Sequence, residues 1–257
     1  MIEDRVAALD TQLFEPVPTS TTDDDRKSLL ALHNCIASRG EFSYLEIGSH
    51  RGGSLQPALL DRRCAHVVSI DPRPQLSPDD RADLDEIAYA DNSTAQMLEN
   101  LRAVPGADLS KLETVEESTE NLAPEELSPP DLCFVDGEHT NEAALRDARF
   151  CRDVMRGVGV IAFHDSYAVE RAILAFLRET PRPHRAYSLR TSIFVVELGV
   201  APSLLGDARV RGQLYRVGRS VAANRLGGDS ALLRMSMLLR RGRSWRRPAS
   251  PVGQPGA

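Results

Sequence analysis

The stretch FSYLEIGSHRGGS, residues 42–54, decides the fold of this 257-residue chain. It opens with a short apolar run, which predicts a buried strand, and continues into a glycine-rich turn. The next segment, LQPALLDRR at residues 55–63, predicts a helix. A strand that leads through a turn into a helix is the repeating unit of α/β proteins with parallel sheets.

The same alternation continues along the chain. Residues 23–40 begin with acids, carry apolar residues at helical spacing and end at Gly40, which predicts a capped amphipathic helix. Further strands are expected at 65–70, 111–118, 131–136 and 160–165, and further helices at 80–104, 140–157 and 169–180. The last two strand candidates, 184–190 and 191–198, adjoin and predict an antiparallel pair. We therefore expect a doubly wound, Rossmann-like α/β sheet, mostly parallel, with an antiparallel edge pair at its C-terminal side.

Composition and charge narrow the class of protein. Hydrophobic residues make up 42% and charged residues 26%, which is typical of a globular domain. The formal net charge of −6 is unevenly distributed, because eleven Arg and one Asp follow residue 207. This extension therefore carries about +10 and the preceding residues about −16. An acidic body argues against nucleic acid as a partner.

The Arg-rich extension contains SALLRMSMLLRR, residues 230–241, in which Leu and Met recur at helical spacing. A basic amphipathic helix can bind an anionic membrane or a partner groove. The interpretation that we favour is a helix packed on the domain or on a second copy in a homo-oligomer. The end of the extension, RRPASPVGQPGA, is expected to be disordered.

Several features predict a cytoplasmic protein without a membrane segment. No run of 18 apolar residues occurs, and the N-terminal MIEDRVAALD is acidic rather than apolar. The four cysteines form no CxxC pair, so we expect buried free thiols in a reducing compartment rather than a zinc site.

The glycine-rich turn that follows the first strand spans residues 46–54, EIGSHRGGS. Glycine suits a backbone that adopts positive φ or approaches a ligand closely. The spacing is neither GxGxxG nor GK[ST], which excludes the dinucleotide fingerprint and the P-loop. Taken alone, the turn is equally compatible with ligand binding and with packing.

Polar residues follow each predicted parallel strand, at the edge of the sheet where doubly wound folds bind ligands. The clusters are Glu46–Gly48, Asp71, Glu117–Ser118, Asp136–His139 and His164–Asp165. Asp71 could accept hydrogen bonds from both hydroxyls of a ribose, which we favour over a simple turn before Pro72. The recurrence of polar residues after the strands predicts a binding site at the carboxyl ends of the strands.

Four segments together resemble the class I S-adenosylmethionine-dependent methyltransferases. They are LEIGSHRGGS (45–54), VVSIDPRP (67–74), DLCFVDGEHTNEAALRDARF (131–150) and GVIAFHD (159–165). More narrowly, they are similar to the group of macrocin-type sugar O-methyltransferases and proteins labelled cephalosporin hydroxylases. The resemblance covers roughly residues 23–200 and implies a methyltransferase domain there. Residues 1–22 are polar and contain Pro16 and Pro18, which indicates an irregular lead-in or possible lid, and residues 201–257 form the Arg-rich extension.

The resemblance also implies which residues contact S-adenosylmethionine. Glu46 and Gly48 would line its methionine portion, and Asp71 would bind its ribose. Glu117 and Ser118 would lie beside the adenine, where relatives more often have Asp-Ser. Ser49, Ser54 and Asp136 complete the expected set of cofactor-binding residues.

Methyl transfer to an alcohol needs a base, a Lewis acid or both, because a hydroxyl of pKa about 16 is a poor nucleophile. The resemblance assigns His139 as general base and Asp136 as ligand of a divalent metal. In metal-dependent sugar enzymes, two acids occupy the positions of His164 and Asp165 and complete a Mg²⁺ site.

Three interpretations of the metal site therefore remain. One is Mg²⁺ held by Asp136, Asp165 and water, the second a softer ion such as Mn²⁺ that includes His164, and the third no metal. The prediction is a divalent metal at Asp136, His164 and Asp165, with Mg²⁺ preferred and Mn²⁺ as the alternative.

The predicted function is O-methylation of a hydroxyl on a sugar, an oligo- or polysaccharide or a glycosylated natural product. Two alternatives belong to other classes: a hydroxylase-type oxidoreductase and a non-catalytic scaffold that retains the cofactor fold. The sequence argues against the first because GxGxxG is missing, and against the second because Asp136 and His139 occur together.

Overall fold

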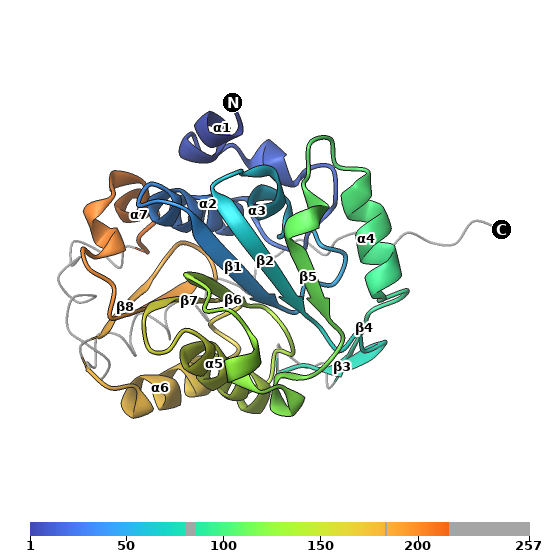
Figure 1. The fold of residues 1–257 in the computed structure, drawn as a ribbon. Helices are drawn as coiled ribbons and strands as arrows, with labels where there is room; N and C mark the ends of the chain where they lie inside the picture. The colour runs from blue at the N-terminus through green and yellow to red at the C-terminus, as the bar shows by residue number, and fades with distance from the viewer. Residues whose placement is uncertain (81–85, 183, 216–257) are drawn as a thin grey trace.

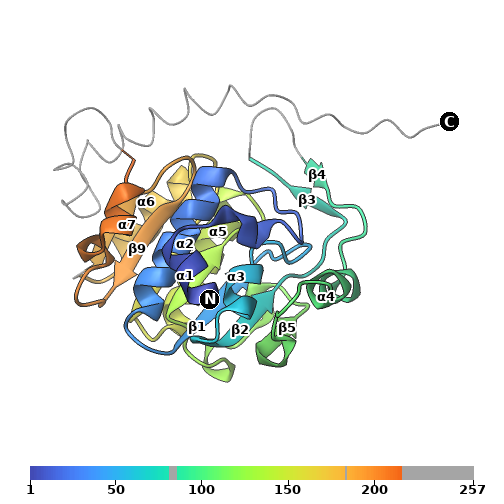
Figure 2. The same cartoon turned by 90° about the horizontal axis from the view of Figure 1, so that it is seen from above.

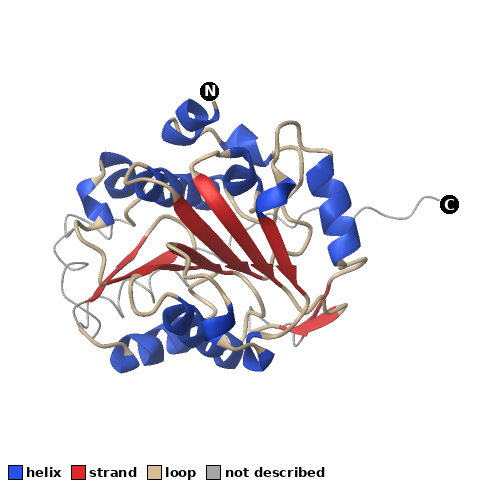
Figure 3. Cartoon of the chain, in the orientation of Figure 1, coloured by secondary structure: helices blue, strands red, loops and turns tan. Residues whose placement is uncertain are grey.

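The computed structural model describes residues 1–80, 86–182 and 184–215, so the predictions for residues 230–241 and for the end of the chain lie outside the described residues. A seven-stranded sheet crosses the molecule between two layers of helices (Figures 1 and 3). In the described part of the chain, no helix is both long and apolar enough to span a membrane.

The sheet has the strand order β5-β2-β1-β6-β7-β9-β8. The first five of these strands run parallel, whereas β9 pairs antiparallel with both β7 and β8. The bounds are β1 Phe42–Ile47, β2 Cys64–Ile70, β5 Leu112–Val115, β6 Leu132–Val135, β7 Gly159–Phe163, β8 His184–Ser188 and β9 Phe194–Leu198. The predicted mostly parallel sheet with an antiparallel edge pair is confirmed.

The strand order reverses at β1, which lies between β2 and β6. Ile47 at the end of β1 is opposite Ile70 on one side and Val135 on the other. The polar residues that follow these three strands therefore emerge at one level of the sheet edge. A reversal of this kind leaves a crevice at the carboxyl ends of the strands, where doubly wound folds bind ligands.

Helices cover both faces of the sheet (Figures 1 and 2). One face carries α1 Ile2–Ala7, α2 Asp23–Ala37, α3 Gln56–Leu60 and α7 Ala208–Gly212, and the other carries α5 Asn141–Val154 and α6 Glu170–Glu179. α4, Thr94–Arg102, lies beside β5 at the edge. Two apolar clusters fill the layers, one including Leu30 and Leu32 of α2, the other Phe163 and Phe176. Burial of these side chains is the main force that holds the layers together.

α2 begins where the sequence predicts it, because Thr22 and Asp25 form a capping box. The Thr22 hydroxyl accepts a hydrogen bond from the backbone N–H of Asp25, and the Asp25 carboxylate accepts one from the N–H of Thr22. Three acids in the first turn further stabilise the positive end of the helix dipole.

Two predictions for the segments around the sheet are wrong. The lead-in is not irregular throughout, since it contains α1 and the 3-10 helix η1 (Thr11–Phe14), and Val6, Leu13 and Phe14 are buried in the core. Among the described residues of this stretch, 80 and 86–104, the helix predicted at 80–104 is present only as α4. Before α4, β3 (Leu76–Pro78) and β4 (Glu86–Ala88) pair as a separate antiparallel hairpin, and Ser93 caps the helix that follows.

Candidate active site

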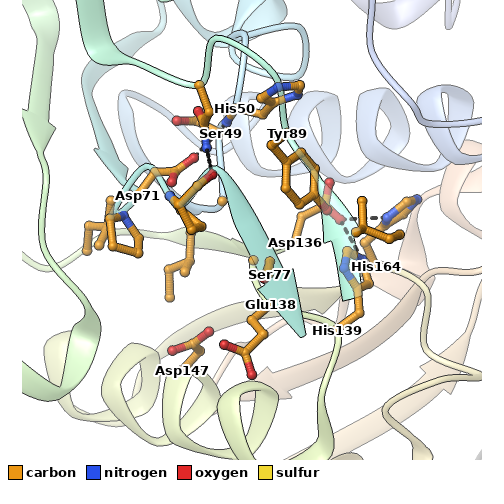
Figure 4. Close-up of a pocket in the computed structure, with 18 of the residues that line it drawn as sticks. Ser49, His50, Asp71, Ser77, Tyr89, Asp136, Glu138, His139, Asp147 and His164 are labelled. Atoms are coloured by element: carbon orange, nitrogen blue, oxygen red, sulfur yellow. Dashed lines mark hydrogen bonds and ion pairs between the residues drawn. The ribbon is translucent and has the colours of Figure 1, made fainter. Parts of the chain in front are cut away.

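A cavity of about 980 Å³ lies at the carboxyl ends of β1, β2 and β6. The residues predicted for the site, with the exception of Glu46, line it together: Gly48, Ser49, Ser54, Asp71, Glu117, Ser118, Asp136, His139, His164 and Asp165. Figure 4 labels Ser49, Asp71, Asp136, His139 and His164 among them. Pockets for small ligands typically measure about 300–1,000 Å³, so this cavity is large enough for more than one small molecule.

The glycine-rich turn forms one wall of the cavity, and Gly48 is required there. Gly48 has φ +87°, and a Cβ on it would collide with the backbone of Asp136 and Gly137. Glycine therefore lets the end of β1 pass against the end of β6, which brings the two halves of the cavity together.

Glu46 lies behind this wall rather than in it. Its carboxylate is fully buried and accepts hydrogen bonds from the Tyr44 hydroxyl, at 2.6 Å, and from the Ser54 hydroxyl. Burial raises the pKa of Glu46 to about 8, although the two hydroxyls favour its ionised form. Glu46 is therefore not among the residues that line the cavity, and the hydrogen bond from Ser54 links it to a residue that does.

Asp71 joins the end of β2 to the glycine-rich turn. Its carboxylate accepts hydrogen bonds from the backbone N–H groups of His50, at 2.9 Å, and Arg73, at 2.8 Å. The buried Arg73 guanidinium lies 3.2 Å from the same carboxylate and donates to the Ser49 hydroxyl at 3.0 Å. The turn-forming role considered for this aspartate is therefore present, and the carboxylate also lines the cavity.

At the other end of the cavity, His164 lies between two carboxylates. Its Nδ1 is 2.7 Å from Oδ1 of Asp136, and its Nε2 is 3.6 Å from Oδ2 of Asp25. Burial disfavours the charged imidazole, but Asp136, Asp165 and Asp25 together raise the pKa of His164 well above its ordinary value. Burial likewise opposes ionisation of Asp136, yet His164 and His139 hold the pKa of that carboxyl well below its usual range.

His139 completes this cluster, as Figure 4 shows. Its Nε2 is 3.4 Å from Asp136 and 3.6 Å from Asp165, distances too long for hydrogen bonds. Within the described residues, neither ring nitrogen of the buried His139 has a hydrogen-bond partner. A buried imidazole with open nitrogens beside two carboxylates is suited to accept a proton or to bind a metal ion.

The donor atoms of Asp136, His139 and His164 lie within 4.8 Å of one another, which makes them a candidate metal-binding group. This set differs from the predicted one, because His139 takes the place assigned to Asp165. Asp165 is nonetheless adjacent, at 4.0 Å from Nδ1 of His164. Its backbone has φ +41°, a conformation that non-glycine residues adopt at a cost and that occurs often at functional sites.

Sequence reasoning missed several residues of the site. Asp25 was assigned only to a helix start, yet Ser192 fixes its Oδ1 through a backbone N–H at 3.1 Å and a hydroxyl at 2.9 Å. His50 lines the cavity and stacks edge-on against Tyr89 at 5.1 Å between ring centroids. Only the tertiary fold brings Asp25 to His164 and the Tyr89 ring to His50.

The β3–β4 hairpin forms the wall that faces the glycine-rich turn. Leu76, Ile87 and Tyr89 give this wall an apolar surface. The hairpin is attached to the catalytic end, since the backbone N–H of Asp80 donates to the carbonyl of His139 at 3.1 Å and its carboxylate accepts from Asn141.

Comparison with known proteins gives one family match. Residues 45–166 match the family described as a methyltransferase domain. No curated protein sequence matches the chain. The matched segment runs from β1 to just beyond β7 and contains all of the predicted site residues.

Solved structures share the fold at low sequence identity. The S-adenosylhomocysteine-bound methyltransferase PaMTH1 of Podospora anserina is 12% identical, with a TM-score of 0.52 over 77% of this chain and 88% of that one. The O-methyltransferase TomG of Streptomyces achromogenes, in complex with S-adenosylmethionine, is 16% identical, with a TM-score of 0.47 over 77% and 88%. The O-methyltransferase of Bacillus cereus, in complex with S-adenosylhomocysteine, is 16% identical, with a TM-score of 0.46 over 77% and 90%. The segment that carries the predicted site therefore matches a methyltransferase domain, and this match supports an enzyme of the methyltransferase class.

Proposed function

We propose that this enzyme transfers a methyl group from S-adenosylmethionine to a hydroxyl of a small molecule, with a sugar or glycosylated natural product as the preferred acceptor class. The observation that carries the proposal is that one cavity joins the glycine-rich turn and Asp71 to the cluster of Asp136, His139 and His164. A protein that only binds the cofactor needs the glycine-rich turn and Asp71, whereas methyl transfer also needs the cluster of Asp136, His139 and His164.

The cofactor would lie along the ends of the central strands. Gly48, Ser49 and Ser54 are placed to contact its methionine portion, and the Asp71 carboxylate its ribose. Glu117 and Ser118 line the cavity beyond β5, on the side where the resemblance places the adenine. When bound, S-adenosylmethionine supplies a methyl group that is already activated on a sulfonium.

His139 would accept the proton that the acceptor hydroxyl loses as its oxygen attacks the methyl carbon. The proton would be held at Nε2, which points between Asp136 and Asp165. The two carboxylates stabilise the positive charge that His139 then carries, and this raises its efficiency as a base. Proximity and alignment within the cavity supply much of the remaining acceleration.

A divalent ion would be held by Asp136, His139 and His164, whose donor set of two imidazoles and one carboxylate fits Mn²⁺, Fe²⁺ or Zn²⁺ better than Mg²⁺. The chemistry that such an ion supplies is Lewis-acid activation, which lowers the pKa of a coordinated hydroxyl. His139 would then act as a ligand, so the base and metal roles exclude each other.

Turnover and cofactor binding separate these roles. Wild type and His139→Ala should be assayed for transfer of a labelled methyl group to a panel of sugars and glycosides, with EDTA and with added Mn²⁺ or Mg²⁺. We expect His139→Ala to bind S-adenosylhomocysteine normally and to lose activity at least about 100-fold. If wild type stays active in EDTA, His139 has the role of base; if wild type requires Mn²⁺, His139 has the role of metal ligand. Full activity of His139→Ala would refute both roles.

A second candidate is a hydroxylase, which one observation favours. Two histidines and one carboxylate form the ligand set used by non-haem Fe²⁺ oxygenases, and this set is present here. Oxygen consumption with Fe²⁺ and no S-adenosylmethionine would support this alternative, and its absence would leave methyl transfer as the function.

A further inference from the structure

The N-terminal segment of residues 14–20 lies outside the matched methyltransferase domain, yet it forms part of the cavity wall. Pro18, Thr19 and Ser20 line the cavity, whereas Phe14 and Val17 are buried in the core below. The segment leads directly into Thr22 and Asp25, and Asp25 faces His164. It therefore runs from the glycine-rich turn to the catalytic cluster.

The side chain that holds this segment is Gln56, the first residue of α3. Gln56 is fully buried, and its Nε2 donates to the carbonyls of Phe14 at 3.2 Å, Val17 at 2.8 Å and Gly53 at 2.8 Å. Its Oε1 accepts from the backbone N–H of Val17 at 3.0 Å. A single buried amide thus bonds both to the segment and to the turn, and both ends of the amide group are used.

The contact between segment and turn is close as well as polar. A Cβ on Gly53 would lie 2.6 Å from the carbonyl oxygen of Pro18 and 2.7 Å from Cβ of Thr19. Gly53 therefore allows the segment to rest directly on the turn. Further along, the Arg26 guanidinium donates to the carbonyl of Thr19 at 3.3 Å.

We propose that Gln56 is a positioning residue for ligand binding, because it clamps residues 14–20 onto the glycine-rich turn and so completes the cavity wall between the turn and the catalytic cluster. The expected effect of Gln56 on ligand binding rests on the proposed function, and S-adenosylhomocysteine is the probe. The clamp itself rests on the contacts of Gln56 alone. The methyltransferase site thereby extends beyond residues 45–166 into the N-terminal segment.

Gln56→Leu tests the clamp, since leucine has a similar volume and no hydrogen-bonding group. Gln96→Ala is the control, because within the described residues the side chain of Gln96 in α4 bonds to Asn100 on its own helix and to no residue of the segment. Amide hydrogen exchange should be measured on the full chain for residues 14–20 and for the core strands. We expect exchange in the segment to accelerate at least about 10-fold in Gln56→Leu and to stay unchanged in Gln96→Ala.

Calorimetric titration with S-adenosylhomocysteine tests the link to binding. We expect the affinity of Gln56→Leu to fall about 10-fold and that of Gln96→Ala to stay within twofold. Unchanged affinity despite accelerated exchange would overturn the ligand role of the segment, and unchanged exchange would overturn the clamp. In wild type, bound S-adenosylhomocysteine should slow exchange in residues 14–20, which keeps the proposal testable if the variant does not fold. A wild type that does not bind this probe refutes the proposed function, while the exchange data still decide the clamp.

Discussion

Glu46 provides the sharpest test of the electrostatics of this fold, because its carboxyl is fully buried. Its carboxyl lies between the Tyr44 and Ser54 hydroxyls, and burial raises its pKa to about 8. In the unfolded chain the pKa of a glutamate is about 4.3. The folded state therefore retains a proton on Glu46 that the unfolded state releases at neutral pH.

The sign and size of the effect on stability follow from this difference. A raised pKa in the folded state contributes stability that is complete below about pH 4 and is lost as the pH rises toward 8. A pKa difference of about 3.5 corresponds to about 5 kcal/mol at pH 9, and to about 3 kcal/mol at pH 7. Glu46→Gln keeps the shape and the hydrogen-bonding groups of the side chain but cannot ionise.

We therefore expect Glu46→Gln to be more stable than wild type by only about 1 kcal/mol near pH 5 and by several kcal/mol at pH 8.5. The assay is urea unfolding, followed by circular dichroism at pH 5, 7 and 8.5. The difference between the two proteins isolates Glu46 from other groups that titrate. A difference that does not grow with pH would refute the reasoning about burial.

The same variant decides the role of Glu46 in binding. Because its carboxylate does not line the cavity, Glu46→Gln should bind S-adenosylhomocysteine within about threefold of wild type, whereas Ser54→Ala, which changes a lining residue, should bind more weakly. If Glu46→Gln lost more than about 30-fold in affinity and Ser54→Ala did not, Glu46 would contact the cofactor directly, as the sequence resemblance implied.

Two further predictions concern residues that fix the geometry of the site. Asp25→Asn should lower the turnover number about 10- to 100-fold and leave the affinity for S-adenosylhomocysteine unchanged. The substitution removes the charge 3.6 Å from His164 but keeps the hydrogen bonds from Ser192. Steady-state kinetics measure this effect, and a turnover number equal to that of wild type would contradict it. Gly48→Ala should abolish S-adenosylhomocysteine binding and destabilise the fold by about 1–3 kcal/mol, since the added Cβ would meet the backbone of Asp136. Calorimetric titration measures the binding and thermal unfolding measures the stability. Wild-type affinity would refute the close approach of Gly48 to the backbone of Asp136.

The parts of the fold that local patterns specify could be predicted from the sequence. Buried parallel strands appear as short apolar runs, and β1, β2, β6 and β7 were found for that reason. The polar residues after these runs were placed at one sheet edge by the topology of parallel sheets alone. All of the predicted site residues except Glu46 consequently line the cavity, together with residues that the sequence did not single out.

The parts that depend on long-range contacts could not be predicted in this way. Asp25 meets Ser192 across 167 positions of sequence, and Gln56 meets Val17 across 39, so no local pattern indicates either pair. β4 lies within the stretch taken for a helix and β3 was not predicted, because each strand has only three residues, too few to show alternation. The family resemblance placed Glu46 at the methionine portion of the cofactor, whereas its hydrogen bonds with Tyr44 and Ser54 become visible only in the structure.

The central claim is that the cavity binds an S-adenosyl cofactor beside the cluster of Asp136, His139 and His164. Its most direct test is calorimetric titration of the purified protein with S-adenosylhomocysteine, with EDTA and with added Mg²⁺ or Mn²⁺. We expect one binding site of micromolar affinity. Asp71→Asn should lower this affinity, and His139→Ala should leave it unchanged. No binding under any of these conditions would contradict it.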